Sequence, residues 1–518
     1  MNRLLKAVIV ALVLLISTTF TFAQQPQQPP AGGASPFAAP DPNRPVGLTV
    51  STDQVSDGYI LLSIIQSPDV IMIDNQGRVV HTWKNEKFRG QAVYLLDNGD
   101  LLRPTYLPDP TMGTGGQWGF TNGLIERYSW DNQLVWSYQK FSDSFVGHHD
   151  IRPMPDGHVL MLAFEKITAD QALASGRKPE LIPDTQVVWS EEVIEIDPAT
   201  NEIVWEWHVW DHIVQDTDVT KPNYGVIAEN PGLIDLNYEP VGRPLTADWL
   251  HANAVAYNAD LDQIMLSIPT YGEIWVIDHS KTTEETKGEA GNLIYRWGNP
   301  AAYDAGSDSG DIIDTELHFQ HDPQWIPEGY PGAGDILIYD NGDNARPHSR
   351  IVQITPPLQD DGTYGLSELA SGTAFGPDEP TWQYTATPPE KFFSPLISSA
   401  QRQPNGNTLI AEGLNGRVFE VNPAGETVWE YYFAPAVWVF RAERYNLPIF
   451  ADLDLTPGGE FAGGTIWRVD CKDGSLQRLH AYLPQEGPAM QLFIDTHGDK
   501  AEDEWKTEAC KEHGGRVE

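Results

Sequence analysis

The chain has few cysteines and no phosphate-binding loop. Only Cys471 and Cys510 occur among its 518 residues, and both lie near the C-terminal end. They are too far apart for a Cys-x-x-Cys redox pair, so we predict that a disulfide between them ties down the tail of an exported chain. No Gly-x4-Gly-Lys sequence is present, and this argues against a loop that cradles nucleotide phosphates.

Positive charge is also scarce. The chain has 33 lysines and arginines against 73 aspartates and glutamates, which gives a formal net charge of −40. Nucleic-acid binding requires a basic stripe, so this balance argues against a nucleic-acid partner. It equally disfavours contact with an anionic membrane surface. We interpret the acidity as a matter of solubility and not of mechanism.

The N-terminus has the form of a secretory signal over residues 1–23. Arg3 and Lys6 precede an apolar run over residues 7–16, and Thr21-Phe22-Ala23 resembles a cleavage site. An uncleaved anchor is the alternative. No other segment approaches the ~20 apolar residues that span a bilayer. Residues 24–45, rich in glutamine and proline, predict a flexible linker. We expect a periplasmic or secreted protein with its folded domain over residues 46–445 and a C-terminal extension over residues 446–518.

Helical periodicity is nearly absent, whereas one pattern of short strands recurs. With 40 prolines, 45 glycines and short apolar alternations, the chain reads as all-β. In the third copy we expect strands over residues 150–154, 159–164, 192–196 and 203–207. A tryptophan closes the fourth strand of every copy: Trp83, Trp136, Trp205, Trp297, Trp382 and Trp429. Four-strand units that repeat in this way stack into a ring, so we predict a six-bladed β-propeller of four-stranded antiparallel blades.

Each copy has an equivalent position six residues before the turn that follows its first strand. Three copies place a histidine there, and the six residues in the order of that alignment are Val50, Gln91, His149, His251, His321 and Ser398. These positions begin the inner strands, on the face that also carries the insertions at 107–122, 167–185, 210–247 and 300–317. We therefore predict a pocket on the ring axis. His148, His158 and His318 alternate away from the axis or lie on the turn face, and we expect them to be structural.

Several segments together resemble the bacterial arylsulfate sulfotransferase family. They are the HHD strand at residue 148, DWLHAN at 248, QHD at 320, ILIYDNGDNARPHSRIVQI at 336, SAQRQPNGNTLIAEG at 399 and VFRAERY at 439. The resemblance covers roughly residues 58–444. It implies an exported six-bladed propeller that moves a sulfuryl group from an aryl sulfate to a phenol. The implied reaction is ping-pong, through a sulfohistidine, with no cofactor and no nucleotide sulfate donor.

The resemblance also implies roles for individual residues. His251 and His321 match family active-site histidines, Asn253 belongs to the first of these motifs, and Arg346 matches the sulfate-binding arginine. Arginine provides planar, paired hydrogen bonds for the sulfuryl oxygens. Further candidates for substrate binding are Arg350, Arg402, Lys391 and Ser398.

The sequence departs from the family at one position. The nucleophilic histidine of the family aligns with Ser398, so either His149 is the natural substitute as nucleophile or the transfer activity has been lost. A neutral imidazole attacks sulfur well and leaves it well, and a second histidine serves as acid and base. Two other hypotheses stay open. His149, His251 and His321 are also a ligand set for a transition metal in an oxidase or lyase, and the propeller is alternatively a non-catalytic binding module.

Overall fold

The computed structural model describes residues 44–457 except 66, 88–89, 106–122, 240–244, 307–314, 367–368 and 434–436. It also describes short strands in the C-terminal tail at 459–460, 467–469, 476–478 and 516–517. All of these residues belong to the unit that spans Ala39–Glu518. The predicted signal, almost all of the linker and both cysteines lie outside the described residues. Among the described helices, none is both long and apolar enough to cross a membrane.

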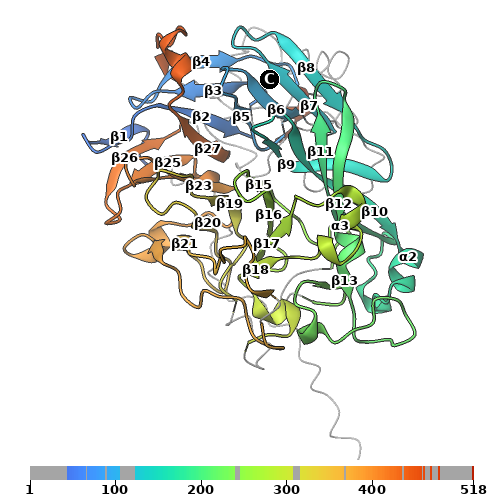
Figure 1. The fold of residues 1–518 in the computed structure, drawn as a ribbon. Helices are drawn as coiled ribbons and strands as arrows, with labels where there is room; N and C mark the ends of the chain where they lie inside the picture. The colour runs from blue at the N-terminus through green and yellow to red at the C-terminus, as the bar shows by residue number, and fades with distance from the viewer. Residues whose placement is uncertain are drawn as a thin grey trace, which may run out of the picture. The chain divides into compact units, whose positions relative to one another are not determined.

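The predicted six-bladed β-propeller is confirmed (Figure 1). Blade 1 consists of β27 (Val439–Tyr445), β2 (Tyr59–Ile64), β3 (Val70–Ile73) and β4 (Arg78–Trp83), with β28 (Gly459–Glu460) at its edge. Blade 2 consists of β5 (Tyr94–Leu95), β6 (Leu101–Thr105), β7 (Leu124–Tyr128) and β8 (Leu134–Gln139). Blade 3 consists of β9 (Phe145–Pro153), β10 (Val159–Thr168), β11 (Val187–Asp197) and β12 (Glu202–His208). The strands predicted for this copy are therefore confirmed, with longer bounds.

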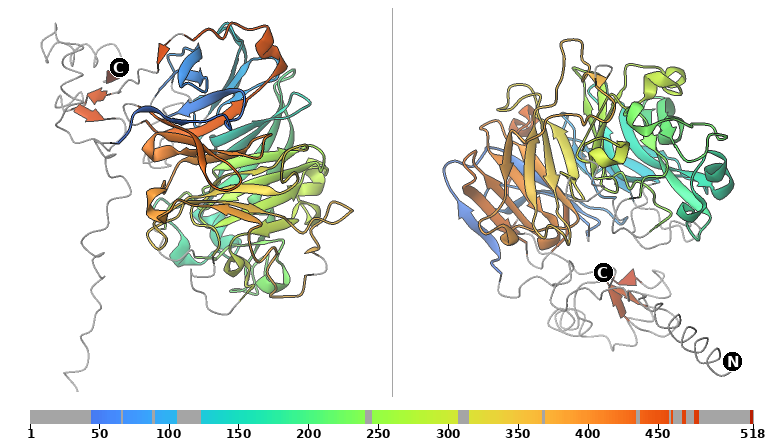
Figure 2. Two further views of the ribbon diagram at one scale, coloured as in Figure 1. Left: turned by 90° about the vertical axis from the view of Figure 1, so that its left-hand side faces the viewer. Right: turned by 90° about the horizontal axis from the view of Figure 1, so that it is seen from below.

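The remaining blades follow the same order from the axis outward. Blade 4 consists of β15 (Ala254–Asn258), β16 (Gln263–Ile268), β17 (Glu273–Asp278) and β18 (Tyr295–Trp297). Blade 5 consists of β19 (His321–Trp325), β20 (Ile336–Asp340), β21 (Arg350–Ile354) and β22 (Trp382–Tyr384). Blade 6 consists of β23 (Ser398–Arg402), β24 (Thr408–Glu412), β25 (Arg417–Val421) and β26 (Thr427–Tyr432), with β1 (Gly47–Ser51) outside β26. The views in Figure 2 show these sheets standing face to face around the ring.

Helices are short and lie in the connections. They are α2 (Ala169–Ala174), α3 (Thr283–Thr286) and the single turns Pro179–Leu181, Val209–His212, Ile227–Glu229, Glu289–Gly291, Pro300–Tyr303, Pro389–Lys391, Gly413–Asn415 and Pro448–Ala451. The crossing from blade 3 to blade 4 holds a parallel pair, β13 (Ile213–Val214) and β14 (Ile234–Asp235). In the tail, β29 (Trp467–Val469) pairs with β30 (Leu476–Arg478) and β31 (Arg516–Val517).

Both ends of the propeller take part in ring closure, and this corrects one prediction. Val50 does not lie on the axis: it belongs to β1, where it pairs with Glu430 on the outer strand of blade 6. The inner strand of blade 1 is instead β27, which pairs with β2 through Leu62–Ala442 and Ser63–Arg441. The sequence ladder misplaced Val50 because the inner strand of the first blade comes from the far end of the chain. By pairing with β2, β27 covers the strand edge that β2 would otherwise leave open.

The six outer tryptophans link each blade to the next. Every one of them lies on the outermost strand of the blade's own four. Each indole N–H donates to an acceptor beside the last turn of the following blade: Ser129 O, Asn201 Oδ1, Lys281 O, Pro377 O, Pro423 O and Asn75 O, at 2.7–3.2 Å. The structural role predicted for these residues is confirmed, because one aromatic ring fills each inter-blade layer and its polar atom is satisfied there.

Two insertions pack together on the face where the inner strands begin. The first contains α2, which starts with a capping box in which Thr168 and Gln171 cap each other. The second runs through β13 and β14. Arg177 donates to Leu236 O at 2.7 Å, and Asn237 donates to Gly176 O at 3.0 Å. These hydrogen bonds join the insertion of blade 3 to the crossing between blades 3 and 4.

Candidate active site

His149 on β9 and His251, three residues before β15, are in direct contact. Their rings lie edge to face with centroids 4.5 Å apart. Both residues have positive φ, 48° and 56°, in a region that few residues other than glycine and asparagine adopt readily. Held in this way by the surrounding sheets, such backbone strain is typical of functional positions. The predicted meeting of these two histidines on the axis is therefore seen in the geometry.

His149 is the end of a buried chain of polar groups. Its Nδ1 lies 2.8 Å from Nδ1 of His148, and Nε2 of His148 lies 2.7 Å from Oε2 of Glu191. All three side chains are buried. The pattern sets the tautomers: if His148 donates to the carboxylate, its Nδ1 accepts the proton of His149 Nδ1–H. The lone pair of His149 then resides on Nε2.

Electrostatics favours the neutral form of His149. Burial is the main cause that holds its pKa well below the usual range, and the nearby rings of His251, His148 and His321 lower it further. Burial also raises the pKa of Glu191, which His148 partly offsets. A neutral imidazole whose second nitrogen is hydrogen-bonded toward a carboxylate has the properties of an activated nucleophile.

His251 has a carboxylate partner of its own. Its Nδ1 lies 2.5 Å from Oδ2 of Asp248, the first residue of the DWLHAN segment. Burial raises the pKa of Asp248, but the charge and hydrogen bond of His251 outweigh burial and leave it below its usual range. The ring is partly exposed, unlike that of His149. An imidazole held in this way by a carboxylate is suited to acid–base work.

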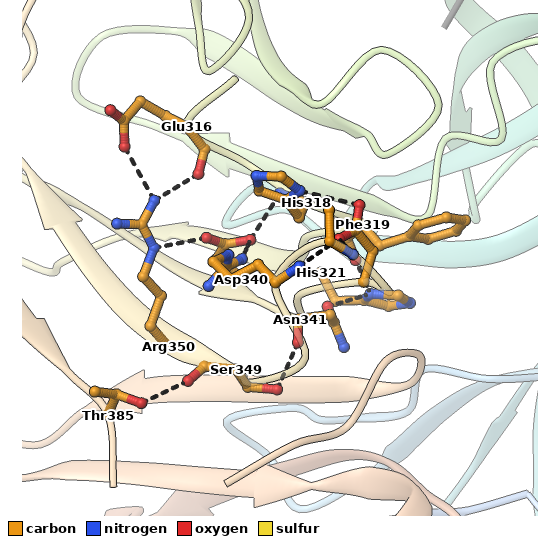
Figure 3. A network of polar contacts seen from close by, with 12 residues as sticks. Glu316, His318, Phe319, His321, Asp340, Asn341, Ser349, Arg350 and Thr385 are labelled. Carbon is orange, nitrogen blue, oxygen red and sulfur yellow. Dashed lines mark hydrogen bonds and ion pairs between the residues drawn. The ribbon is translucent and has the colours of Figure 1, made fainter. Parts of the chain in front are cut away.

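His321 is tied into the polar network of blade 5 (Figure 3). Its Nδ1 lies 2.8 Å from Oδ1 of Asn341 and 3.0 Å from the carbonyl of Phe319. The amide of Ile397 approaches Nε2 at 3.4 Å. Burial lowers the pKa of His321 to about 4. This histidine is neutral and engaged at both nitrogens, which favours a supporting role over that of nucleophile.

Ser398 lies beside the same network. It is buried, and it exchanges hydrogen bonds with Asn341 at 3.0 and 3.2 Å. No histidine or carboxylate is seen to contact its Oγ among the described residues, so no base activates it. The structure thus leaves the position that aligns with the family nucleophile without the means to act as one.

The predicted arginines separate into two groups. Arg346 and Arg350 both pair with Asp340, at 2.5 and 2.7 Å, and Arg350 also reaches Glu316 (Figure 3). Asp340 precedes Asn341, so this pair flanks the His321 network, although no contact to the axial histidines is seen. Arg402 ends β23, where it donates to Gly406 O and to Gln353 at the opposite end of the strand from Ser398.

The other two predicted residues are also placed. Asn253, fully buried, donates from Nδ2 to the carbonyl of Gln320 at 2.9 Å and so joins blade 4 to blade 5. Lys391 is the last residue of the single turn Pro389–Lys391 before β23, and it is exposed. Neither lies in direct contact with the three histidines in the part of the chain that the structure describes.

Arg441 is a central residue that the repeat alignment missed. It occupies the inner strand of blade 1, and its guanidinium contacts Asp150 at 3.1 Å and Asp322 at 3.0 Å. Tyr94 donates to Asp150 at 2.8 Å and also bonds Arg441. Burial raises the pKa of Asp322 to about 7, although Arg441 lowers it. This network fills the axis next to the histidines. The VFRAERY segment, noticed as part of the family resemblance, was the available signal.

Groups with metal-ligand geometry lie elsewhere. Within the described residues, the sets whose three ligand atoms lie within 4.8 Å of one another are Asp156–His158–Glu195 and Glu165–Glu192–His208. The three axial histidines are not among these sets. The geometry therefore gives no support to a three-histidine metal centre.

Comparison with known proteins decides the family. The family model described as Arylsulfotransferase (ASST) matches residues 48–431, which is most of the chain and includes the inner strands of blades 2–6. The chain belongs to the arylsulfotransferase family. No curated protein matches it significantly. The resemblance found in the sequence is thereby confirmed.

Solved structures share only the architecture of this arylsulfotransferase-family chain. A protein of unknown function from Bacteroides caccae has 11% identity and a TM-score of 0.39, and the match covers 75% of this chain and 98% of that one. A streptogramin B lyase has 12% identity and a TM-score of 0.35, with 77% and 85% covered. A virginiamycin B lyase from Staphylococcus aureus has 9% identity and a TM-score of 0.33, with 75% and 89% covered. Likeness at this level carries no argument about function.

Proposed function

We propose that this protein transfers a sulfuryl group from an aryl sulfate to a phenolic acceptor at the axial histidines. The observation that carries the proposal is the buried chain Glu191–His148–His149, which ends in ring contact with His251. The family supports small aryl sulfates and phenols as the class of substrate. The chain thus combines a neutral nucleophile and a separate acid–base histidine in one place.

In the first half-reaction, His149 is the nucleophile. Its Nε2 lone pair attacks sulfur, the N–S bond forms and the S–O bond to the aryl group breaks. The ring becomes positively charged, and the hydrogen bond through His148 to Glu191 stabilises that charge. His251 in its protonated form donates its Nε2 proton to the departing phenoxide, while Asp248 holds the ring in place.

The second half-reaction reverses these roles. Neutral His251 accepts the proton of the incoming phenol, whose oxygen attacks sulfur. The N–S bond breaks, the new S–O bond forms and His149 returns to its neutral state. No oxidant, metal or nucleotide enters the balance of either step.

Arg346 is our candidate for binding the sulfuryl oxygens. Its side chain is ion-paired to Asp340, yet its three nitrogens lack a well-aligned hydrogen bond and are buried. Buried donors of this kind have unused capacity for an anion. The role requires the guanidinium to reach toward the axis from the neighbouring network of His321.

We also propose that the chain acts after export, in the periplasm or outside the cell. The support is the form of residues 1–23. Detection of the mature N-terminus after Ala23 in fractionated cells is the corresponding test.

An assay with 4-nitrophenyl sulfate as donor and phenol as acceptor tests the proposed reaction. Wild type releases 4-nitrophenol only at a rate that depends on both compounds, as ping-pong transfer requires. His149→Asn, which suits the positive φ of that position, abolishes release. His158→Ala, a histidine at the opposite turn face, is the control. No release by the wild type above the rate without protein would point instead to a binding module, and equal release in wild type and His149→Asn would remove His149 from the mechanism.

A further inference from the structure

A cavity of about 260 Å³ lies at the other end of the central channel. The cavity is lined by the C-terminal ends of five inner strands, β5, β9, β19, β23 and β27. On the side of the ring toward the histidines, His149 precedes Arg152 on β9, His321 is the first residue of β19, and His251 lies just before β15. Between the cavity and the histidines lies the network of Arg441, Asp150 and Asp322. The cavity is therefore separate from the candidate active site.

Arg152 gives this cavity a positive charge that no described carboxylate meets at ion-pair distance. Its side chain forms no hydrogen bond and no ion pair with any described residue, and its guanidinium lies 5.4 Å from the centre of the Tyr94 ring. Burial lowers the pKa of Arg152, but Tyr94 and Glu443 outweigh burial and raise it overall. The side chain is thus cationic and partly exposed to the cavity.

The absence of a partner is unusual in this chain. Carboxylates outnumber lysines and arginines more than two to one, and most described arginines form an ion pair with a carboxylate. The buried arginines that pair with a carboxylate are Arg103, Arg296, Arg441 and Arg444. An arginine that has no ion-pair partner beside a cavity has hydrogen-bond donors available to an external anion.

A second arginine and aromatic walls complete the lining. Arg402 borders the cavity and donates to Gly406 O at 2.8 Å and to Gln353, with no carboxylate in ion-pair distance among the described residues. Trp325 and Tyr330 supply aromatic surface. Glu443 is the one carboxylate of the lining, and it accepts a hydrogen bond from Tyr445 at 2.5 Å. The lining therefore carries a net positive charge.

We propose that this channel mouth is a second binding site, for a small aromatic anion such as an aryl sulfonate, sulfate or carboxylate. Arg152 binds the anionic group, and the aromatic walls hold the ring. The volume limits the ligand to about one substituted ring, because drug-sized ligands require larger pockets, on the order of 300–1,000 Å³.

Benzenesulfonate is the probe, since its C–S bond prevents turnover. Calorimetric titration of the full-length protein compares wild type with Arg152→Gln and Arg152→Lys. We expect Arg152→Gln to weaken one class of site by at least ~10-fold, the loss expected for a hydrogen bond to a charged group, and Arg152→Lys to restore part of it. The matched control is Arg127→Gln. Arg127 lies on β7 of blade 2, and its charge is paired with Asp100.

Two further readouts decide between this site and the histidines. The rate of sulfuryl transfer and the KM for the donor stay unchanged in Arg152→Gln, because the two ends of the channel are separate. Unchanged benzenesulfonate binding in Arg152→Gln would overturn the proposal, and so would binding of inorganic sulfate as tight as that of the probe. Binding is measured without turnover, so this result is independent of the proposed transfer reaction.

Discussion

The outer and inner strands of this propeller differ in how they use the same six-fold repeat. On the outer strands one residue recurs in all six blades, and each indole N–H bonds the following blade. On or just before the inner strands the aligned residues differ: Gln91, His149, His251, His321 and Ser398, with Arg441 on the inner strand of blade 1. Packing against the next blade is required in every blade, so the same residue type recurs there. A single site on the axis requires different side chains from different blades. The uniform tryptophans are therefore structural, and we interpret the varied axial positions as the place of the proposed chemistry.

The largest effect is expected from His149. His149→Asn removes the nucleophile while keeping a residue that tolerates the observed φ of 48°. We expect the transfer rate to fall by about 10⁴-fold or more, as is usual when a nucleophile is lost. Steady-state release of 4-nitrophenol measures this, with thermal unfolding as the check on folding. A fall of less than tenfold would remove the special status of this axial position.

His251 should show a smaller loss that depends on the leaving group. His251→Asn removes general acid–base help, and the expected cost is at least ~10² in rate. Phenyl sulfate should suffer more than 4-nitrophenyl sulfate, because the poorer leaving group needs the proton more. Equal losses with both donors would indicate that His251 acts through binding alone.

His321 should appear in the pH dependence of stability. Its pKa is about 4 in the folded protein against about 6.5 in the unfolded chain. Above pH 6.5 both states are neutral and His321 contributes nothing. As pH falls toward 4, only the unfolded chain takes up the proton, so folding loses about 3 kcal/mol.

Urea unfolding at pH 7.5 and pH 4 measures this term. In His321→Gln the acid-induced loss should be smaller by about that amount, since glutamine does not titrate. The comparison cancels other acid-sensitive groups, among them His149, whose pKa is shifted in the same direction. The same acid dependence in both proteins would contradict a buried, neutral His321.

The outer tryptophans should affect stability and not rate. Trp205→Phe removes the indole bond to Lys281 O at 2.8 Å and should cost about 1–2 kcal/mol. Trp136→Phe should cost less, because Trp136 is more exposed and bonds a side chain. A change in transfer rate in either fully folded variant would contradict a purely structural role for the outer-strand tryptophans.

The smallest effect is expected at Ser398. Ser398→Ala removes hydrogen bonds with Asn341, and we expect a cost of about 1 kcal/mol or less in stability. Transfer should continue at nearly the wild-type rate. Loss of activity comparable to that of His149→Asn would return the nucleophile to the position that aligns with the family.

Much of the fold could be predicted because the four strands of most blades are consecutive in the sequence. Turn spacing and the recurring tryptophan specified the blades, and the aligned position brought His149 and His251 together as expected. Closure was harder. The inner strand of blade 1 comes from residues 439–445, so Arg441 was invisible to an alignment of consecutive copies, and Val50 was assigned to the axis in its place.

His148 was missed for a different reason. Strict alternation along a strand turns neighbours to opposite faces, and on that basis His148 was predicted to be structural. The register of β9 against β10 shifts between Met161 and Ala163, and His149 has positive φ. This bulge lets both rings meet, so His148 joins the relay to Glu191. Such bulges are common next to active sites, but no sequence pattern in this strand predicts one.

Trapping the covalent intermediate tests the central claim most directly. The protein is mixed with 4-nitrophenyl sulfate without acceptor, quenched and digested, and the sulfo-adduct is located by tandem mass spectrometry. The account predicts an adduct on His149 that disappears when phenol is added before the quench. An adduct on His251, His321 or Ser398, or transfer that proceeds with no adduct at all, would contradict it.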